Sequence, residues 1–116
     1  IRFEFLDMSD IWSEANVERA LLELRDTDEE YGRLKGQVLG LEKNEKVIFG
    51  AEYLETEGTV DERKSQAHNS TAYKEWLSVY EGAVADLHIL TAKRATKQAF
   101  IEAWRSIYSG RKRGNV

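Results

Sequence analysis

Apolar residues recur every three or four positions along the first half of the chain. These spacings alternate over more than four heptads, and the chain contains no proline to interrupt them. The series comprises Val17, Ala20, Leu24, Thr27, Tyr31, Leu34, Val38, Leu41, Glu45 and Ile48. Such a seam is typical of a helix that packs along a partner helix. We therefore predict a long helix over residues 9–56, with its first cap at Ser9 or Ser13.

A second series with the same spacing follows in the second half. It comprises Tyr73, Trp76, Tyr80, Ala83, Leu87, Leu90, Arg94, Lys97, Ile101, Trp104 and Tyr108. This series predicts another long helix over residues 71–109, which Gly110 can end.

The segment between the two series carries turn and capping residues. Gly58 suits the left-handed conformation that follows many helices. Thr59 and Glu62 form a capping-box pair, which predicts a short helix over residues 60–67. Asn69 or Ser70 then caps the second long helix.

These elements predict an all-α fold, in which a long antiparallel helical hairpin carries a short corner helix. The hairpin is predicted to form a single domain over residues 1–116. Residues 1–8 alternate weakly in polarity and are predicted as an N-terminal arm. Residues 110–116, beyond the last helix, are predicted as a flexible basic tail.

Both long helices carry more apolar side chains than one seam needs. The additional positions are Leu21, Leu22, Leu39, Val47, Phe49, Leu54, Leu77, Val84, Ile89 and Phe100. One hairpin cannot cover both sides of each helix, so we predict a homo-oligomer. Gly32, Gly36 and Gly40 are its predicted contact, because each interior glycine costs a helix about 1 kcal/mol relative to alanine without a close neighbour. The alternative is that these glycines mark a kink or are simply tolerated.

The composition disfavours catalysis. The chain has no cysteine and two histidines, and it contains no phosphate-binding loop, no GxSxG and no HExxH motif. The acids from Asp26 to Glu30 resemble part of a calcium loop, but Tyr31 stands where such a loop requires glycine, so a solvated helix face is the better interpretation. We therefore expect no enzymatic activity, no cofactor and no metal site. With no membrane-length apolar run and no secretory leader, the sequence predicts a cytoplasmic protein without a membrane partner.

Charge is distributed unevenly along the chain. The whole sequence has a net charge of -4, yet residues 93–116 hold seven basic side chains and one acid. Phosphates attract such cations, and an exposed aromatic ring can stack on an unpaired base. The predicted nucleic-acid-binding residues are therefore Arg105, Tyr108, Arg111, Lys112 and Arg113.

Part of this basic segment has a structural interpretation. Arg94 and Lys97 interrupt the second seam, where they can pair with the acidic first helix instead of DNA. Phe100 and Trp104 have the spacing of core residues. Cations near a helix C-terminus also complement the helix dipole, so a solvated helix end is the alternative to phosphate binding.

Several runs of the sequence resemble small helical proteins that tailed bacteriophages encode near their recombination genes. These runs are Tyr31-Gly-Arg-Leu-Lys-Gly-Gln-Val-Leu-Gly-Leu, Gly58-Thr-Val-Asp-Glu-Arg-Lys-Ser-Gln-Ala, Tyr73-Lys-Glu-Trp and Ala103-Trp-Arg-Ser. The order of the elements is also similar, more distantly, to the UvsY recombination mediators of T-even phages. The resemblance implies a ring-forming, non-enzymatic protein that binds single-stranded DNA, helps displace single-strand-binding protein and loads a RecA-type recombinase. It also implies that Arg63 and Lys64 contact DNA.

The resulting hypothesis is an oligomeric single-stranded-DNA-binding accessory protein of phage recombination or replication, located in the host cytoplasm. Two alternatives stay open. One is a non-enzymatic adaptor that binds another protein or inhibits a host factor. The other is a virion or scaffold component, which would have no affinity for nucleic acid.

Overall fold

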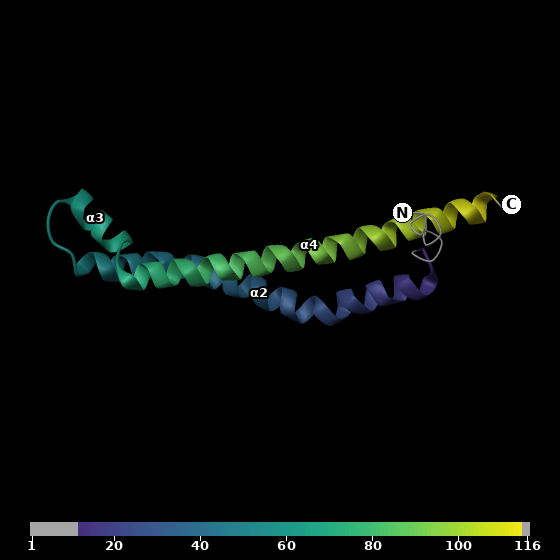
Figure 1. The fold of residues 1–116 in the computed structure, drawn as a ribbon, viewed down its shortest axis with the longest axis horizontal. Helices are drawn as coiled ribbons and strands as arrows, with labels where there is room; N and C mark the ends of the chain where they lie inside the picture. The colour runs from purple at the N-terminus through teal and green to yellow at the C-terminus, as the bar shows by residue number, and fades with distance from the viewer. Residues whose placement is uncertain (1–11, 115–116) are drawn as a thin grey trace, which may run out of the picture. The chain divides into compact units, whose positions relative to one another are not determined.

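The computed structural model describes the backbone of residues 12–114 and the side chains of residues 12–110. This part of the chain contains the helices α2 (Glu14–Leu54), α3 (Val60–His68) and α4 (Thr71–Gly114), and no strand (Figure 1). The predicted all-α hairpin with a short corner helix is confirmed. The predicted N-terminal arm, residues 1–8, lies outside the described residues.

A polar side chain caps the start of each helix. The hydroxyls of Ser13, Thr59 and Ser70 each accept a hydrogen bond from the backbone N–H three residues later, at 3.3, 3.3 and 3.2 Å. These bonds satisfy backbone donors that have no partner within the helix. The alternative cap, Asn69, instead follows the end of α3. The predicted break between the two long helices is therefore confirmed.

The two long helices end at different places from those predicted. α2 stops at Leu54, two residues before the predicted end, and Gly58 in the connection has a φ of 118°. The predicted end of the second long helix at Gly110 was wrong, because α4 continues to Gly114. Gly110 keeps a negative φ. The basic residues that follow it complement the negative end of the helix dipole, which favours the added turn. Residues 110–114 of the predicted flexible tail are thus helical.

Packing divides the chain into two units. The terminal unit contains the residues before 30 and after 89, and the central unit is Glu30–Ile89. Both α2 and α4 contribute to each unit. The core of the terminal unit is formed by Val17, Ala20 and Ile101, with Leu24, Phe100 and Trp104 packed against it.

In the central unit, the second half of α2 pairs with the first half of α4 (Figure 1). The indole nitrogen of Trp76 donates to the backbone oxygen of Leu41 at 2.9 Å. Val38, Trp76 and Ala83 are buried along this contact, and Ala67 of α3 is fully buried. The antiparallel pairing places the two predicted seams against each other.

Both predicted seams are the covered sides of their helices. Each seam has one exposed member, Glu45 in α2 and Tyr108 in α4, while the other seam positions are buried or half-buried. Most of the additional apolar positions are exposed, namely Leu21, Leu22, Leu39, Val47, Leu54, Leu77 and Ile89. These exposed apolar side chains are the reason why self-association is expected.

Candidate nucleic-acid interface

Arg94 binds α2 within the terminal unit. Its guanidinium donates to the backbone oxygen of Leu24 at 2.8 Å, to Thr27 Oγ1 at 2.7 Å and to Asp28 Oδ1 at 2.6 Å. The Arg94 side chain is 15% exposed. Lys97, almost one turn later, pairs with Glu23 at 2.8 Å. These two cations hold α4 against α2, which agrees with the structural interpretation of both residues.

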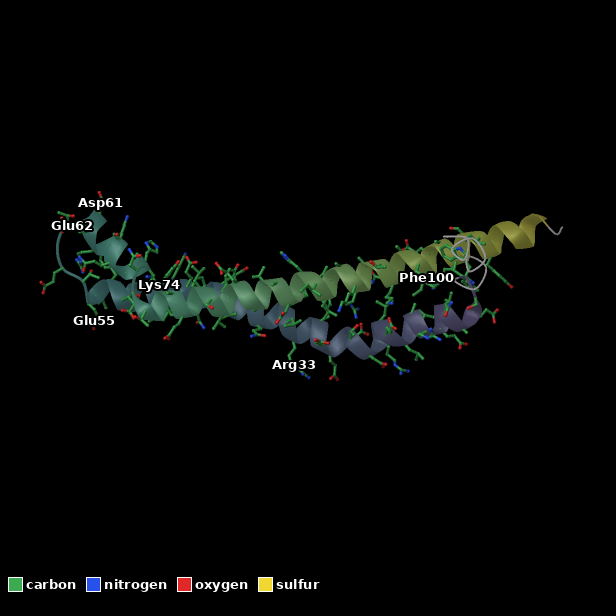
Figure 2. The ribbon with its side chains drawn as sticks, in the orientation of Figure 1. Arg33, Glu55, Asp61, Glu62, Lys74 and Phe100 are labelled. Carbon is green, nitrogen blue, oxygen red and sulfur yellow. The ribbon has the colours of Figure 1, made fainter. Side chains whose placement is uncertain are left out.

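Aromatic rings follow on the next turns of α4. Phe100 (labelled in Figure 2) stacks on Trp12, with ring centroids 5.1 Å apart and planes 7° from parallel. Trp104 is half-buried and stacks on Tyr108 at 5.3 Å and 15°. Tyr108 is 50% exposed. The interpretation of Phe100 and Trp104 as core residues is therefore confirmed, and Tyr108 presents a supported ring to solvent.

The basic positions beyond these rings lie on the last turns of α4. Arg105 is exposed. The side chains of Arg111, Lys112 and Arg113 lie outside the described residues, but their backbone is helical. Positions 105, 108 and 112 are separated by three and four residues, so they share one side of the helix. The basic positions 105 and 112 and the exposed Tyr108 therefore lie along one line on the helix.

Arg63 of α3, which the resemblance implies as a DNA contact together with Lys64, interacts with the end of α2. Its guanidinium donates to Thr56 Oγ1 at 3.0 Å and to the backbone oxygen of Tyr53 at 3.1 Å. It also lies over the Tyr53 ring, 4.1 Å from the centroid. The Tyr53 carbonyl, in the last turn of α2, also accepts from the backbone N–H of Thr56 at 3.1 Å and from its hydroxyl at 2.6 Å. Arg63 therefore acts as a cap that ties α3 to α2, whereas its neighbour Lys64 is exposed.

Sequence reasoning missed this cap. The available signal was a basic residue placed shortly after the end of a helix, a position from which such side chains can bond the final carbonyls. Gln66 supports the same connection by donating to the backbone oxygen of Glu57 at 3.0 Å. Figure 2 shows the acidic residues Asp61 and Glu62 at the start of α3, where they complement the positive end of its dipole.

The three predicted contact glycines have open surroundings in this chain. A Cβ added at Gly32, Gly36 or Gly40 would meet no heavy atom within 4 Å. Their spacing of four places them on the side of α2 opposite the seam. Among the described residues, no close neighbour therefore accounts for these glycines.

Aromatic side chains form a continuous group in the central unit. The His68 ring lies 4.6 Å from that of Phe49 and 5.1 Å from that of Tyr73. The Tyr80 hydroxyl donates to Glu42 Oε1 at 3.0 Å, and this bond, with partial burial and the nearby carboxylates, raises the pKa of Tyr80. Burial and the charge of Glu45 raise the pKa of Tyr73. Both pKa shifts favour the neutral phenol.

No protein-family model, curated protein or solved structure matches this chain. Within residues 12–114, no group of three or more histidine or acidic side chains is placed to hold a metal ion. The described helices include none that is both long and apolar enough to cross a membrane.

Proposed function

We propose that this protein is an oligomeric, non-enzymatic single-stranded-DNA-binding accessory protein of phage recombination or replication. The supporting observation is the contrast between two groups of basic residues on α4. Arg94 and Lys97 are bound to acids of α2. Arg105 is exposed, and it stands with three further basic positions on a helix that continues to Gly114.

The proposed binding uses two kinds of contact. The cations at Arg105, Arg111, Lys112 and Arg113 neutralise phosphates of the strand and release its counterions. The exposed Tyr108 ring offers a stacking surface for one base, and Trp104 holds that ring in place. Arg63 makes its bonds to the end of α2, so the exposed Lys64 is the favoured of the two proposed contacts on α3.

One chain offers few phosphate contacts, so its affinity is expected to be weak and sensitive to salt. Several copies would bring several basic helix ends to one strand and raise the affinity through effective concentration. The proposed assembly uses the open side of α2 that contains Gly32, Gly36 and Gly40. A strand held in this way is presented to other proteins, and the proposed partners are a RecA-type recombinase or single-strand-binding protein in the host cytoplasm.

The test compares the intact chain with a chain that ends at Ser109. Binding of a fluorescent single strand is measured at low and moderate salt. Three lost phosphate contacts are expected to flatten the slope of log affinity against log salt by about 2, since each contact on a single strand contributes about 0.7. If affinity and slope are both unchanged, the basic end of α4 is not the binding site.

A matched control removes the same charge elsewhere. Lys35, Lys43 and Lys46 are exposed lysines on α2. Changing all three to glutamine also removes three positive charges, but it leaves α4 intact. This variant is expected to keep the salt slope of the intact chain. A similar loss in both variants would indicate a general charge effect and would count against the proposed site.

The second candidate function is an adaptor that binds another protein. It is favoured by Leu39, Val47 and Leu54, which are 55%, 67% and 79% exposed on α2. Their spacing, together with that of the glycines, places them on the side of α2 opposite the seam. This function predicts no strand affinity at low salt from a folded chain.

A further inference from the structure

An open groove runs between α2 and α4 in the terminal unit. It consists of two adjoining hollows of about 490 and 260 Å³. Glu23, Thr96 and Lys97 line both hollows, so they are neighbouring parts of one groove. The ion pair between Lys97 and Glu23 lies where the two parts meet. Apolar side chains contribute to the lining at Ala20, Leu24, Leu90 and Phe100.

The groove is open to solvent and lies beside the core of the terminal unit. Leu24 and Leu90 belong to the seams, yet both border this hollow. Leu90 is already buried, whereas Leu24 and Phe100 are half-buried, so a second surface over the groove would complete the burial of these two side chains.

The two walls of the larger hollow carry opposite charges. The α2 wall includes Glu23 and Asp26, and the α4 wall includes Lys93, Arg94 and Lys97. Lys97 and Arg94 are paired with α2 of their own chain. Lys93 is exposed, and Asp26 is 65% exposed with a contact to the neighbouring Arg25 at 3.2 Å. The charges of Asp26 and Lys93 are therefore accessible to a partner.

We propose that this groove is closed by the same groove of a second copy of the chain, so that the two terminal units form a four-helix bundle. The proposal rests on the self-association in the proposed function, and it adds a second contact to the one through the open side of α2. Two hairpin faces can meet about a two-fold axis that runs along the helices or across them. The charges of the walls distinguish these arrangements.

An axis across the helices would place α2 on α2 and bring acidic walls together. An axis along the helices places α2 of each copy over α4 of the other, so that acidic walls face basic walls. Asp26 and Lys93 stand at nearly the same level, because Arg94 bonds Thr27 in the same chain. In the second arrangement Asp26 therefore faces Lys93 of the partner subunit, and the pair occurs twice. Opposite charges across an interface favour this arrangement over the first.

The experiment uses Asp26→Lys and Lys93→Glu in the full chain. Self-association is measured by sedimentation over a range of concentrations, without DNA. Each variant alone places two like-charged pairs in the interface, so its dimer is expected to dissociate at a concentration at least about tenfold higher than that of the unmodified chain. An equal mixture of the two variants restores both opposite pairs and is expected to dimerise as the unmodified chain does. The double variant should also recover.

Several results would overturn the proposal. These are an unmodified chain that stays monomeric, variants that associate normally, and a mixture that does not recover. Loss of association in Gly36→Leu together with normal association in both charge variants would place the contact on the open side of α2 instead. Helix content measured by circular dichroism separates loss of folding from loss of contact. Strand binding is measured separately, so a dimer without strand affinity would contradict the proposed function and leave this inference intact.

Discussion

At the scale of single residues, two arginines on α4 have different surroundings. The Arg94 guanidinium is largely buried and bonds three oxygens of α2. Arg105 is exposed, on the turn that carries the stacked Trp104 and Tyr108 rings. Both are basic residues at helical spacing. Arg94 holds the fold through its contact with α2, whereas the exposed Arg105 is available to a phosphate.

Replacing Arg94 by methionine should destabilise the protein. The change removes charge-assisted bonds and leaves Asp28 without this partner, so a loss of about 2 kcal/mol in the free energy of unfolding is expected. Urea denaturation followed by far-ultraviolet circular dichroism measures the change. Arg105→Met is the matched control and should stay within about 0.5 kcal/mol of the unmodified chain. Equal effects of the two substitutions would contradict the assigned roles.

At the scale of helices and their connections, the passage from α2 to α3 depends on one backbone conformation and two side chains. Gly58 has a φ of 118°, which side chains of L-residues rarely adopt. A Cβ at this position would also collide with the Glu62 carboxylate. Thr59 caps α3, and Arg63 caps α2. The direction in which the chain turns is therefore set locally.

Gly58→Ala should destabilise the protein by about 1–2 kcal/mol, because alanine is strained at positive φ and meets Glu62. Gly82→Ala is the matched control, since Gly82 lies within α4 with no atom within 4 Å of an added Cβ. There the same change should stabilise the protein by about 0.5–1 kcal/mol through helix propensity. Thermal unfolding of both variants measures whether the first change lowers the stability and the second raises it. A stable Gly58→Ala variant would show that the connection does not require this conformation.

Most of the fold at this scale could be predicted from local chemistry. The three-and-four spacing identified the covered side of both long helices, and the caps at Ser13, Thr59 and Ser70 were recognisable from their residue types. The end of α4 could not be predicted, because whether the helix ends at Gly110 depends on the weak helix preferences of the residues after it. The cap by Arg63 was missed although it joins residues only seven and ten positions apart. The groove beside Leu24 could not be predicted, since it depends on the distance between helices far apart in sequence.

At the scale of the whole molecule, the proposed assembly and the proposed strand binding are linked. The proposed phosphate contacts of one chain are few, so affinity depends on how many copies one strand can reach. Two kinds of self-contact are proposed, through the groove of the terminal unit and through the open side of α2 that contains Gly36. A two-fold contact through the groove alone gives a dimer, whereas a second contact allows a larger closed assembly.

Gly36→Leu should reduce both assembly size and strand affinity without changing any charge. The added side chain would occupy the space that the glycine leaves open to a neighbouring backbone, so the assembly should fall to the dimer that the groove supports. Loss of avidity should then weaken binding to a long single strand by about tenfold or more. Light scattering and strand titration measure the two effects. Gly82→Leu, a change of the same kind on α4, should alter neither. An assembly of normal size in Gly36→Leu would remove the open side of α2 from the proposed contacts, and normal affinity in a smaller assembly would separate strand binding from assembly.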